Sequence, residues 1–433
     1  AVYLAVGVMA TFFLTITVLL CMMSMGRRRP GKDRRAAKQL GAPLSRFLTW
    51  VIATNLNHTH KILVVSALIF ALAFAGMGKL SVGFNFLEEF KEKVEFRQHT
   101  EYIEKVMGGM LSLVYVFDAG KPDGIKNADL LQRLADLQKK ADSDPLVKKT
   151  YSIVDILKDL NQSFHGDDPA YHTLPADNAL ISQYLLLYEI SGGKELQDYV
   201  TGDYARTALE IRMEMTASEK IKRLIRDLDA ALDRDTTARV QTTGIGLLWI
   251  KICDYIASSQ IFGYLMAFSM IAFLMCVVFR SVKVGLLSMV PNLAPIVLCL
   301  GLMGWQGLHL DYFRLLLATV AIGIAVDDTI HLVARMRKEF LQCGDYAAAL
   351  SNSMSSVGRA LVITSAILML AFSAFLSSQM VVLASFGVLL MLTIFTALVA
   401  DLFLMPALIL VFKPFGRPAT VKAGPAVLET DLL

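Results

Sequence analysis

The sequence predicts a polytopic α-helical membrane protein that carries one large α/β domain outside the membrane. Two observations support this fold class. The 433-residue chain is 55% hydrophobic and only 18% charged, whereas soluble domains are about 25% charged. Its apolar residues gather into seven stretches, most of them near the ~20 helical residues that cross about 30 Å of hydrocarbon. One long polar stretch interrupts them.

These stretches divide the chain into six parts. We expect a membrane helix at 1–25, a basic cytoplasmic linker at 26–61, a membrane helix at 62–78, a periplasmic α/β domain at 79–255, a five-helix membrane bundle at 256–412 and a cytoplasmic tail at 413–433. The first residue is Ala1, and the apolar span starts there without the basic residues that precede the apolar core of a signal peptide. We therefore interpret the chain as a piece of a longer protein that starts in a membrane helix.

Basic residues set the predicted orientation. Lys and Arg are dense between Arg27 and Arg46, and they recur at 280–283, at 335–338 and in the tail. Because short loops rich in Lys and Arg stay in the cytoplasm, alternation of the spans puts 79–255 outside. All the short loops agree with this one assignment.

The polar stretch has the pattern of a mixed α/β domain. Its β-rich segments predict strands at 110–118, 146–153, 204–215 and 239–243. Helical spacing of apolar residues predicts helices at 128–141, 156–164, 179–190 and 217–233. We expect Thr216 to cap the last helix. Two βαβ units around a helical insertion suit a ferredoxin-like α/β sandwich.

The fifth apolar stretch contains two adjacent carboxylates, Asp327 and Asp328. Thr319, Gly323, Asp327 and His331 recur at every fourth position, so on a helix they line one stripe. A charge within hydrocarbon costs at least ~2.5–3.5 kcal/mol, which makes an intramembrane carboxylate a functional candidate by default. Such a carboxylate can bind and release a proton or a sodium ion as helices shift.

Neighbouring residues extend this hypothesis to a proton relay. Thr364 and Ser365 are hydroxyls of the sixth stretch at a similar depth, and His331 adds an imidazole. Gly323 would let another helix approach closely.

The fourth stretch contains Pro291, Asn292 and Pro295. Two prolines predict a helix kink there, either for packing alone or as a hinge near a substrate path.

Other interpretations of the aspartates are weaker. An intramembrane aspartyl protease would need a second helix, and only Asp401 could pair with Asp327. The residues before Asp327 are Gly-Ile-Ala-Val instead of the Gly-x-Gly of such proteases. A structural salt bridge lacks a partner, because the apolar parts of the spans contain no Lys or Arg. We expect Asp401 itself to serve structural bonding.

The sequence also argues against several kinds of ligand. The five cysteines are scattered, and His58 and His60 have no third ligand nearby, so we expect no metal. No Walker A pattern occurs, so we expect no ATP hydrolysis and no cofactor. The basic run 27–35 lies beside a span and fits a topological role, with anionic lipids rather than nucleic acid as its contact.

Several motifs together resemble the resistance-nodulation-division (RND) superfamily, in particular its MMPL-type exporters. They occur in the family's order, at residues 290–296, 323–331, 358–365, 386–387 and 400–406. Thr243-Gly244 and 107–109 also resemble it. Family members have twelve spans in two similar halves, each with a porter domain after its first span. This chain resembles the last span of the first half followed by the second half, and its last five spans are similar to a sterol-sensing domain.

The resemblance implies a function. Asp327 and Asp328 match the family's coupling carboxylates, and Thr364-Ser365 stand where it often places hydroxyls. The implied protein is a proton-driven exporter, not an enzyme, in a bacterial inner membrane. Its substrate would be a lipid or other hydrophobic compound, such as a hopanoid, a sterol-like molecule, a fatty acyl lipid or a siderophore-like compound. Implied partners are membrane lipids, the N-terminal half, other copies of the chain and a periplasmic carrier protein. The alternative is a sterol-sensing-type receptor that binds lipid without pumping.

Overall fold

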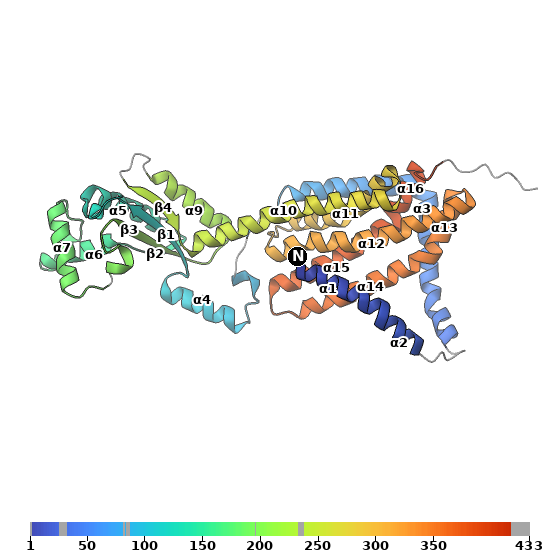
Figure 1. Cartoon of the computed structure of the whole chain (residues 1–433), viewed down its shortest axis with the longest axis horizontal. Coiled ribbons are helices and arrows are strands. Elements are labelled where there is room, and N and C mark those ends of the chain that lie inside the picture. Colours follow the sequence, from blue (N-terminus) through green and yellow to red (C-terminus); the bar gives the residue numbers. More distant parts are fainter. Residues whose placement is uncertain are drawn as a thin grey trace, which may run out of the picture.

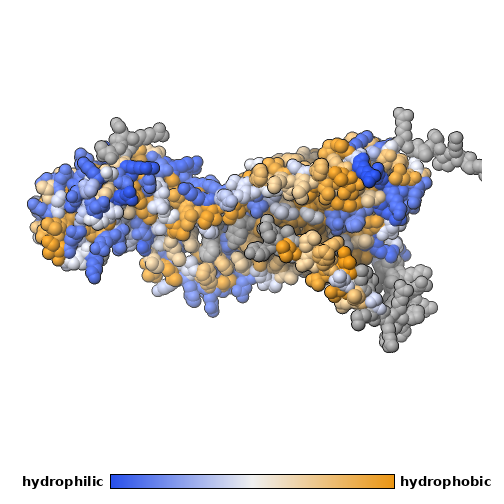
Figure 2. Space-filling view, viewed as in Figure 1, coloured by the Kyte–Doolittle hydropathy of each residue, from blue (hydrophilic) through white to orange (hydrophobic). Residues whose placement is uncertain are grey.

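The computed structural model describes residues 2–25, 33–80, 83, 87–194, 196–232 and 238–416. The fold is mostly helical, and its α/β part and its helical bundle lie at opposite ends of an elongated molecule (Figure 1). Helix α10 (Ile245–Val278) starts directly after the sheet and runs into the bundle. In Figure 2 orange apolar residues cover much of the bundle, and blue polar residues gather on the α/β part and at the bundle's far end.

Six helical segments of the described chain are long and apolar enough to cross a membrane. They are Pro43–Met77, Ile245–Val278, Val282–Trp305, Phe313–Cys343, Tyr346–Ser377 and Val381–Phe412. The first of the seven predicted spans is helical as α1 (Val2–Leu14), a π-helical turn (Thr15–Leu19) and α2 (Leu20–Met25). Within it, Val6–Val18 counts only as a shorter apolar helix.

The bundle is built around helix α11 (Val282–Trp305), whose residues are the most buried of the six spans. It packs against α3 (Asp33–Met77), α10, α12 (Tyr312–Cys343) and α15 (Val381–Val399). The approach to α3 is so close that a Cβ added at Gly301 would lie 2.6 Å from the Cα of Ala73. The backbone of α11 stays helical through Pro291 and Pro295, and both prolines are buried.

Helix α3 bends sharply at His58, where the backbone leaves the helical region (φ −130°, ψ 27°). Figure 1 shows the part before the bend lying across the end of the bundle farthest from the α/β part, and the part after it running along the bundle. The second part contains the predicted span 62–78. Of the predicted linker 26–61, residues 33–61 are helical except at His58, and residues 26–32 lie outside the described residues.

The remaining bundle elements follow α12. They are α13 (Tyr346–Ser353), a π-helical turn (Met354–Gly358), α14 (Arg359–Ser373), a 3-10 turn (Ala374–Ser377), α15, a second π-helical turn (Ala400–Leu404) and α16 (Met405–Phe412).

The α/β part contains a four-stranded antiparallel sheet in the order β2-β3-β1-β4. Its strands are β1 (Leu111–Asp118), β2 (Val147–Tyr151), β3 (Arg206–Met213) and β4 (Arg239–Thr243). Burial alternates along β1 and β3, so one face of the sheet carries the core. All four strands lie within the predicted segments.

Helices connect and flank these strands. α5 (Ala128–Asp142) joins β1 to β2, and α9 (Ser218–Ala231) joins β3 to β4. α6 (Ile153–Phe164), α7 (Asn178–Ile190) and α8 (Leu196–Tyr199) form the insertion, and α4 (Glu95–Met107) precedes the sheet. Short 3-10 turns occur at Leu87–Glu89, Gly124–Lys126 and Pro169–Tyr171. The prediction that Thr216 caps α9 is wrong: the helix starts at Ser218, so Ala217 holds the cap position and no side chain bonds there.

Candidate functional site

The predicted stripe of α12 lies on the outer surface of the bundle. Thr319, Gly323, Asp327 and His331 are all exposed. A Cβ added at Gly323 would meet no described atom within 4 Å. The imidazole of His331 approaches the Asp327 carboxylate to 3.6 Å, and the two side chains remain 68% and 75% exposed. The carboxylate–imidazole pair therefore lies on a helix face that no described part of the chain covers.

Asp328 points the other way, towards neighbouring helices. Its side chain is partly buried, and the hydroxyl of Ser365 lies close enough to interact with its carboxyl group. Ser365 itself is only 1% exposed. Thr364 instead lies on the surface, where its hydroxyl donates to the carbonyl of Ala360 in its own helix (2.9 Å). Of the two predicted hydroxyls, the fold brings Ser365 and not Thr364 to the aspartates.

A second polar cluster lies deeper, where α11, α12 and the π-helical turn Ala400–Leu404 meet. The hydroxyl of Thr329 lies 2.7 Å from Asn292 Oδ1 and 2.6 Å from Asp401 Oδ1. All three residues are at most 2% exposed. The cluster adjoins the aspartate pair, because Asp401 also interacts electrostatically with Asp328. Polar groups thus continue from the bundle surface into its core.

The close contacts of Thr329 limit where the hydrogen atoms of this cluster can lie. A hydroxyl has one proton, so Thr329 can donate to one of its two close neighbours and must accept from the other. The buried Nδ2 of Asn292 has no partner among the described residues. Two arrangements meet this requirement. With the amide of Asn292 turned over, its Nδ2 donates to Thr329 and Thr329 donates to an ionised Asp401. With the amide as it stands, a protonated Asp401 donates to Thr329, and Thr329 donates to Asn292 Oδ1.

The irregular backbone around Asp401 is stabilised by α3. Pro406 has no N–H, so it cannot donate to the carbonyl of Leu402 four residues earlier. The buried amide of Asn55 donates to that carbonyl instead (2.9 Å) and to Val51 in its own helix (2.9 Å). π-helical turns frequently mark functional sites.

Sequence patterns predicted some of these residues and missed others. Asp401 was visible as a carboxylate in an apolar span, and its buried hydrogen bond agrees with the structural bonding expected of it. Asn292 was expected only as part of a kink. Thr329 and Asn55 were missed, because a polar uncharged residue in a helix says nothing about which distant segment it meets.

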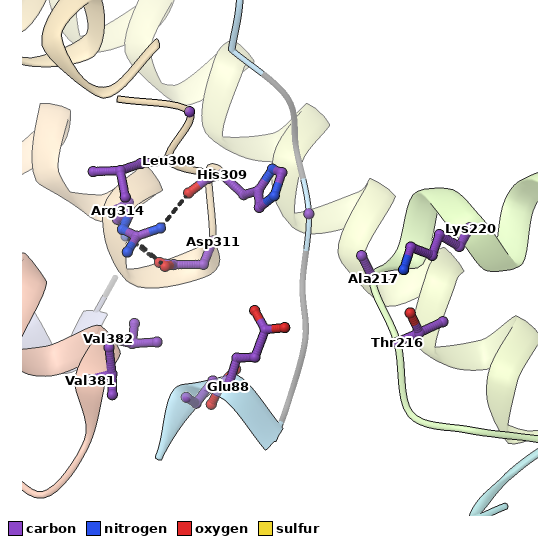
Figure 3. Close-up of a pocket in the computed structure, with 13 residues that line it drawn as sticks. Glu88, Thr216, Ala217, Lys220, Leu308, His309, Asp311, Arg314, Val381 and Val382 are labelled. Atoms are coloured by element: carbon purple, nitrogen blue, oxygen red, sulfur yellow. Dashed lines mark hydrogen bonds and ion pairs between the residues drawn. The ribbon is translucent and has the colours of Figure 1, made fainter. Parts of the chain in front are cut away.

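A polar cavity of about 330 Å³ lies between the α/β part and the adjoining ends of the spans (Figure 3). Four segments form its labelled walls. Thr216, Ala217 and Lys220 lie at the start of α9, and Leu308, His309, Asp311 and Arg314 lie in the α11–α12 connection and the first turn of α12. Val381 and Val382 begin α15, and Glu88 belongs to the 3-10 turn before α4. Arg314 donates to the carbonyl of His309 (2.6 Å) and pairs with Asp311 (3.2 Å). Burial raises the pKa of Asp311, against the opposing effects of the Arg314 backbone N–H and guanidinium.

An apolar hollow of about 210 Å³ lies next to this cavity and shares Thr216 with it. Its other walls are Leu111, Met215, Ile245 and Trp249. The boundary between the α/β part and the bundle therefore offers adjoining polar and apolar spaces. No group of three potential metal ligands occurs among the described residues.

Comparisons with known proteins place this site in a family. A profile of the MMPL family matches residues 199–426, just over half of the chain, including all of α10 to α16. No curated protein matches the chain. One similar solved structure is a crystal structure of SecDF in its super-membrane-facing form, at 15% identity and a TM-score of 0.36. That match covers 84% of this chain and 38% of the SecDF chain, so the chain spans less than two fifths of its length. The motifs around Asp327 and the family profile together identify the chain as a member of the MMPL family, a group of RND-type membrane transporters.

Proposed function

We propose that this chain is the C-terminal half of a proton-driven transporter that exports a lipid or another hydrophobic compound. The observation that carries the proposal is the adjacent pair Asp327 and Asp328, with one carboxylate on an open helix face and the other turned into the bundle. Carboxylates in a membrane span are costly and mark ion pathways. In this proposal protons from one side of the membrane reach Asp327 and Asp328 and leave to the other side.

The neighbours of the pair suggest how protonation would move helices. An ionised Asp328 and an ionised Asp401 would repel each other across the helix interface, and a proton on either carboxyl group removes that repulsion. Ser365 can donate to the ionised form or accept from the protonated form. His331 would exchange protons with Asp327, and Thr364 would join the relay only if α14 turned. A sodium ion could take the proton's place.

The exposed stripe of α12 also suggests that a second half of the transporter packs against it. Leaving Asp327 against lipid would be unfavourable, and Gly323 leaves room for another helix to pack closely. We propose that the N-terminal half of the transporter covers this face of α12. The pair would then lie between the two halves.

The α/β part is proposed as a periplasmic porter domain. Its β1-α5-β2 and β3-α9-β4 units and its strand order suit a ferredoxin-like sandwich. The apolar hollow beside Trp249 and the polar cavity beside it would receive a molecule with an apolar body and a polar end. A hopanoid, a sterol-like molecule or a fatty acyl lipid has this form. The location in this proposal is a bacterial inner membrane, and other copies of the chain or a periplasmic carrier would complete the route.

Reconstitution tests the proposal. The full two-half protein is placed in liposomes with a pH gradient, and proton flux and release of a lipid substrate are measured. Asp327→Asn and Asp328→Asn should each abolish both signals. Asp227→Asn, which neutralises an exposed carboxylate of α9, should change neither. If both membrane variants still transport at the normal rate, proton coupling by this pair is wrong. Lipid binding without any proton-dependent flux would instead favour the sterol-sensing-type receptor.

A further inference from the structure

A second surface site lies at the bend of α3, at the end of the bundle away from the α/β part (Figure 1). A hollow of about 560 Å³ opens there between the bend and the end of α16. Its walls are Leu56, Asn57, His58, Thr59, His60, Lys61, Leu410, Val411 and Lys413. None of the residues assigned to the carboxylate site or to the polar cavity of Figure 3 contributes to it.

The charged and ionisable groups around this hollow are all basic. Lys61 and the two histidines come from α3, and Lys413 comes from the end of α16. Lys283, at the start of α11, donates to the carbonyl of Phe412 (3.3 Å) and adds a further ammonium group beside Lys413. Among the described residues, no carboxylate lines the hollow and no ion pair involves Lys61 or Lys413. The hollow is therefore suited to an anion.

The backbone holds these groups in an unusual arrangement. His58 leaves the helical region, so Lys61 stands at the start of the part of α3 that runs along the bundle. Lys413 ends α16 with a positive φ of 42°, a conformation uncommon for a residue other than glycine. Residues held in such sparsely populated backbone conformations cluster at active sites and ligand-binding sites.

An apolar surface begins where the basic hollow ends. On α3, Val64, Val65 and Leu68 are 68%, 54% and 71% exposed within two turns of Lys61. On α16, Val411 and Phe412 are also exposed. A ligand in the hollow would thus have cations around one end and an exposed apolar helix surface along the other. A free inorganic anion would use only the first of these features.

We propose that this hollow binds the headgroup of an anionic phospholipid from the leaflet opposite the α/β part. Lys61 and Lys413 contact the phosphate, the histidines and Thr59 supply hydrogen bonds, and the acyl chains lie along α3 and α16. Basic pockets between helices at a membrane surface recognise anionic lipids in this way. The site is independent of the proposed transport and would remain if the transport proposal failed.

Lipid titration of the purified full chain, followed by native mass spectrometry, tests the site. Phosphatidylglycerol should bind to one site more tightly than phosphatidylcholine, and millimolar inorganic phosphate should not displace it. A basic side chain near a membrane surface contributes ~1 kcal/mol to anionic lipid binding, which corresponds to about fivefold in affinity. Lys61→Gln with Lys413→Gln should therefore weaken phosphatidylglycerol binding about 25-fold.

Two further double variants make the result specific. Arg46→Gln with Lys338→Gln removes the same charge from exposed residues outside the hollow and should leave binding at the wild-type level. Lys61→Arg with Lys413→Arg keeps the charge and should retain most of the affinity. Equal weakening by the two glutamine pairs, equal binding of phosphatidylcholine, or displacement by inorganic phosphate would each overturn the proposal.

Discussion

The hydroxyl of Thr329 and the carboxyl group of Asp401 lie 2.6 Å apart in the core of the bundle, joining α12 to the last span across 72 residues of sequence. Because both residues are buried, neither can exchange this partner for water. Thr329→Val keeps the shape of the side chain but leaves Asp401 and Asn292 without a hydrogen-bonding neighbour. A buried polar group left in this way costs about 1–3 kcal/mol, so we expect a clearly lower thermal stability.

A thiol-reactive dye measures this change, because Cys253 and Cys299 are buried and react only on unfolding. Cys21 is exposed, and Cys276 and Cys343 are only partly buried, so all three are first replaced by Ser to remove the background. Thr329→Ser keeps the hydroxyl and should lose much less stability. A Thr329→Val protein as stable as the wild type would show that the contact contributes nothing.

Asn55 and Pro406 should behave as a coupled pair. Asn55→Leu removes the donor to the Leu402 carbonyl and should destabilise the bundle by about 1–3 kcal/mol. Pro406→Ala restores a backbone N–H that can serve the same carbonyl. In that background Asn55→Leu should cost less, with a coupling of at least ~0.5 kcal/mol in a double-mutant cycle followed by the same dye. Strictly additive effects would contradict this account of the π-helical turn.

Local patterns predicted much of the architecture. Apolar residues alternate in the sequences of β1 and β3, as burial does in the structure. The spacing of four residues correctly placed Gly323, Asp327 and His331 on one face of α12. Such patterns depend only on the geometry of one strand or one helix.

These local patterns could not predict contacts between segments that lie far apart in the sequence. The Thr329–Asp401 bond requires the packing of two helices, and the aspartate stripe gave no hint of it. The bend at His58 was equally hidden, because the residues around it have no proline or glycine to mark a break. Thr216 was misassigned as a cap because helix ends follow backbone geometry more closely than residue type.

Gly323 and Gly304 should respond in opposite ways to alanine. At Gly304 an added Cβ would collide with the carbonyl oxygen of Gly76 in α3, so Gly304→Ala should destabilise the chain. Gly323 faces open space, so Gly323→Ala should be neutral or stabilise α12 by up to ~1 kcal/mol through helix propensity.

A larger residue at Gly323 distinguishes an effect on the folding of this chain from an effect on its assembly with the N-terminal half. Gly323→Leu should leave the isolated chain stable and prevent its co-purification with the N-terminal half, because the added side chain blocks close packing on α12. Normal co-purification would place the companion half elsewhere. The thermal assay on each chain shows whether the variant is folded.

Glu104 should make the stability of the α/β part depend on pH. Burial raises the pKa of Glu104 above its usual 4.5, although the N–H of Met215 donates to its carboxylate and works in the opposite direction. The folded chain therefore binds this proton more tightly than the unfolded chain. Its contribution to stability is fully present below pH 4.5 and is lost as the pH rises through the folded-state pKa.

Glu104→Gln removes this titration and keeps an acceptor for Met215. Its stability relative to the wild type should therefore increase from pH 4 to pH 7, with a slope of at most ~1.4 kcal/mol per pH unit. Glu104→Leu also loses the acceptor, so it should show the same pH trend with a constant destabilisation added. Thermal unfolding of the three proteins across this range measures both effects. Wild-type and Glu104→Gln curves that stay parallel at every pH would show that the Glu104 carboxylate is not the group responsible.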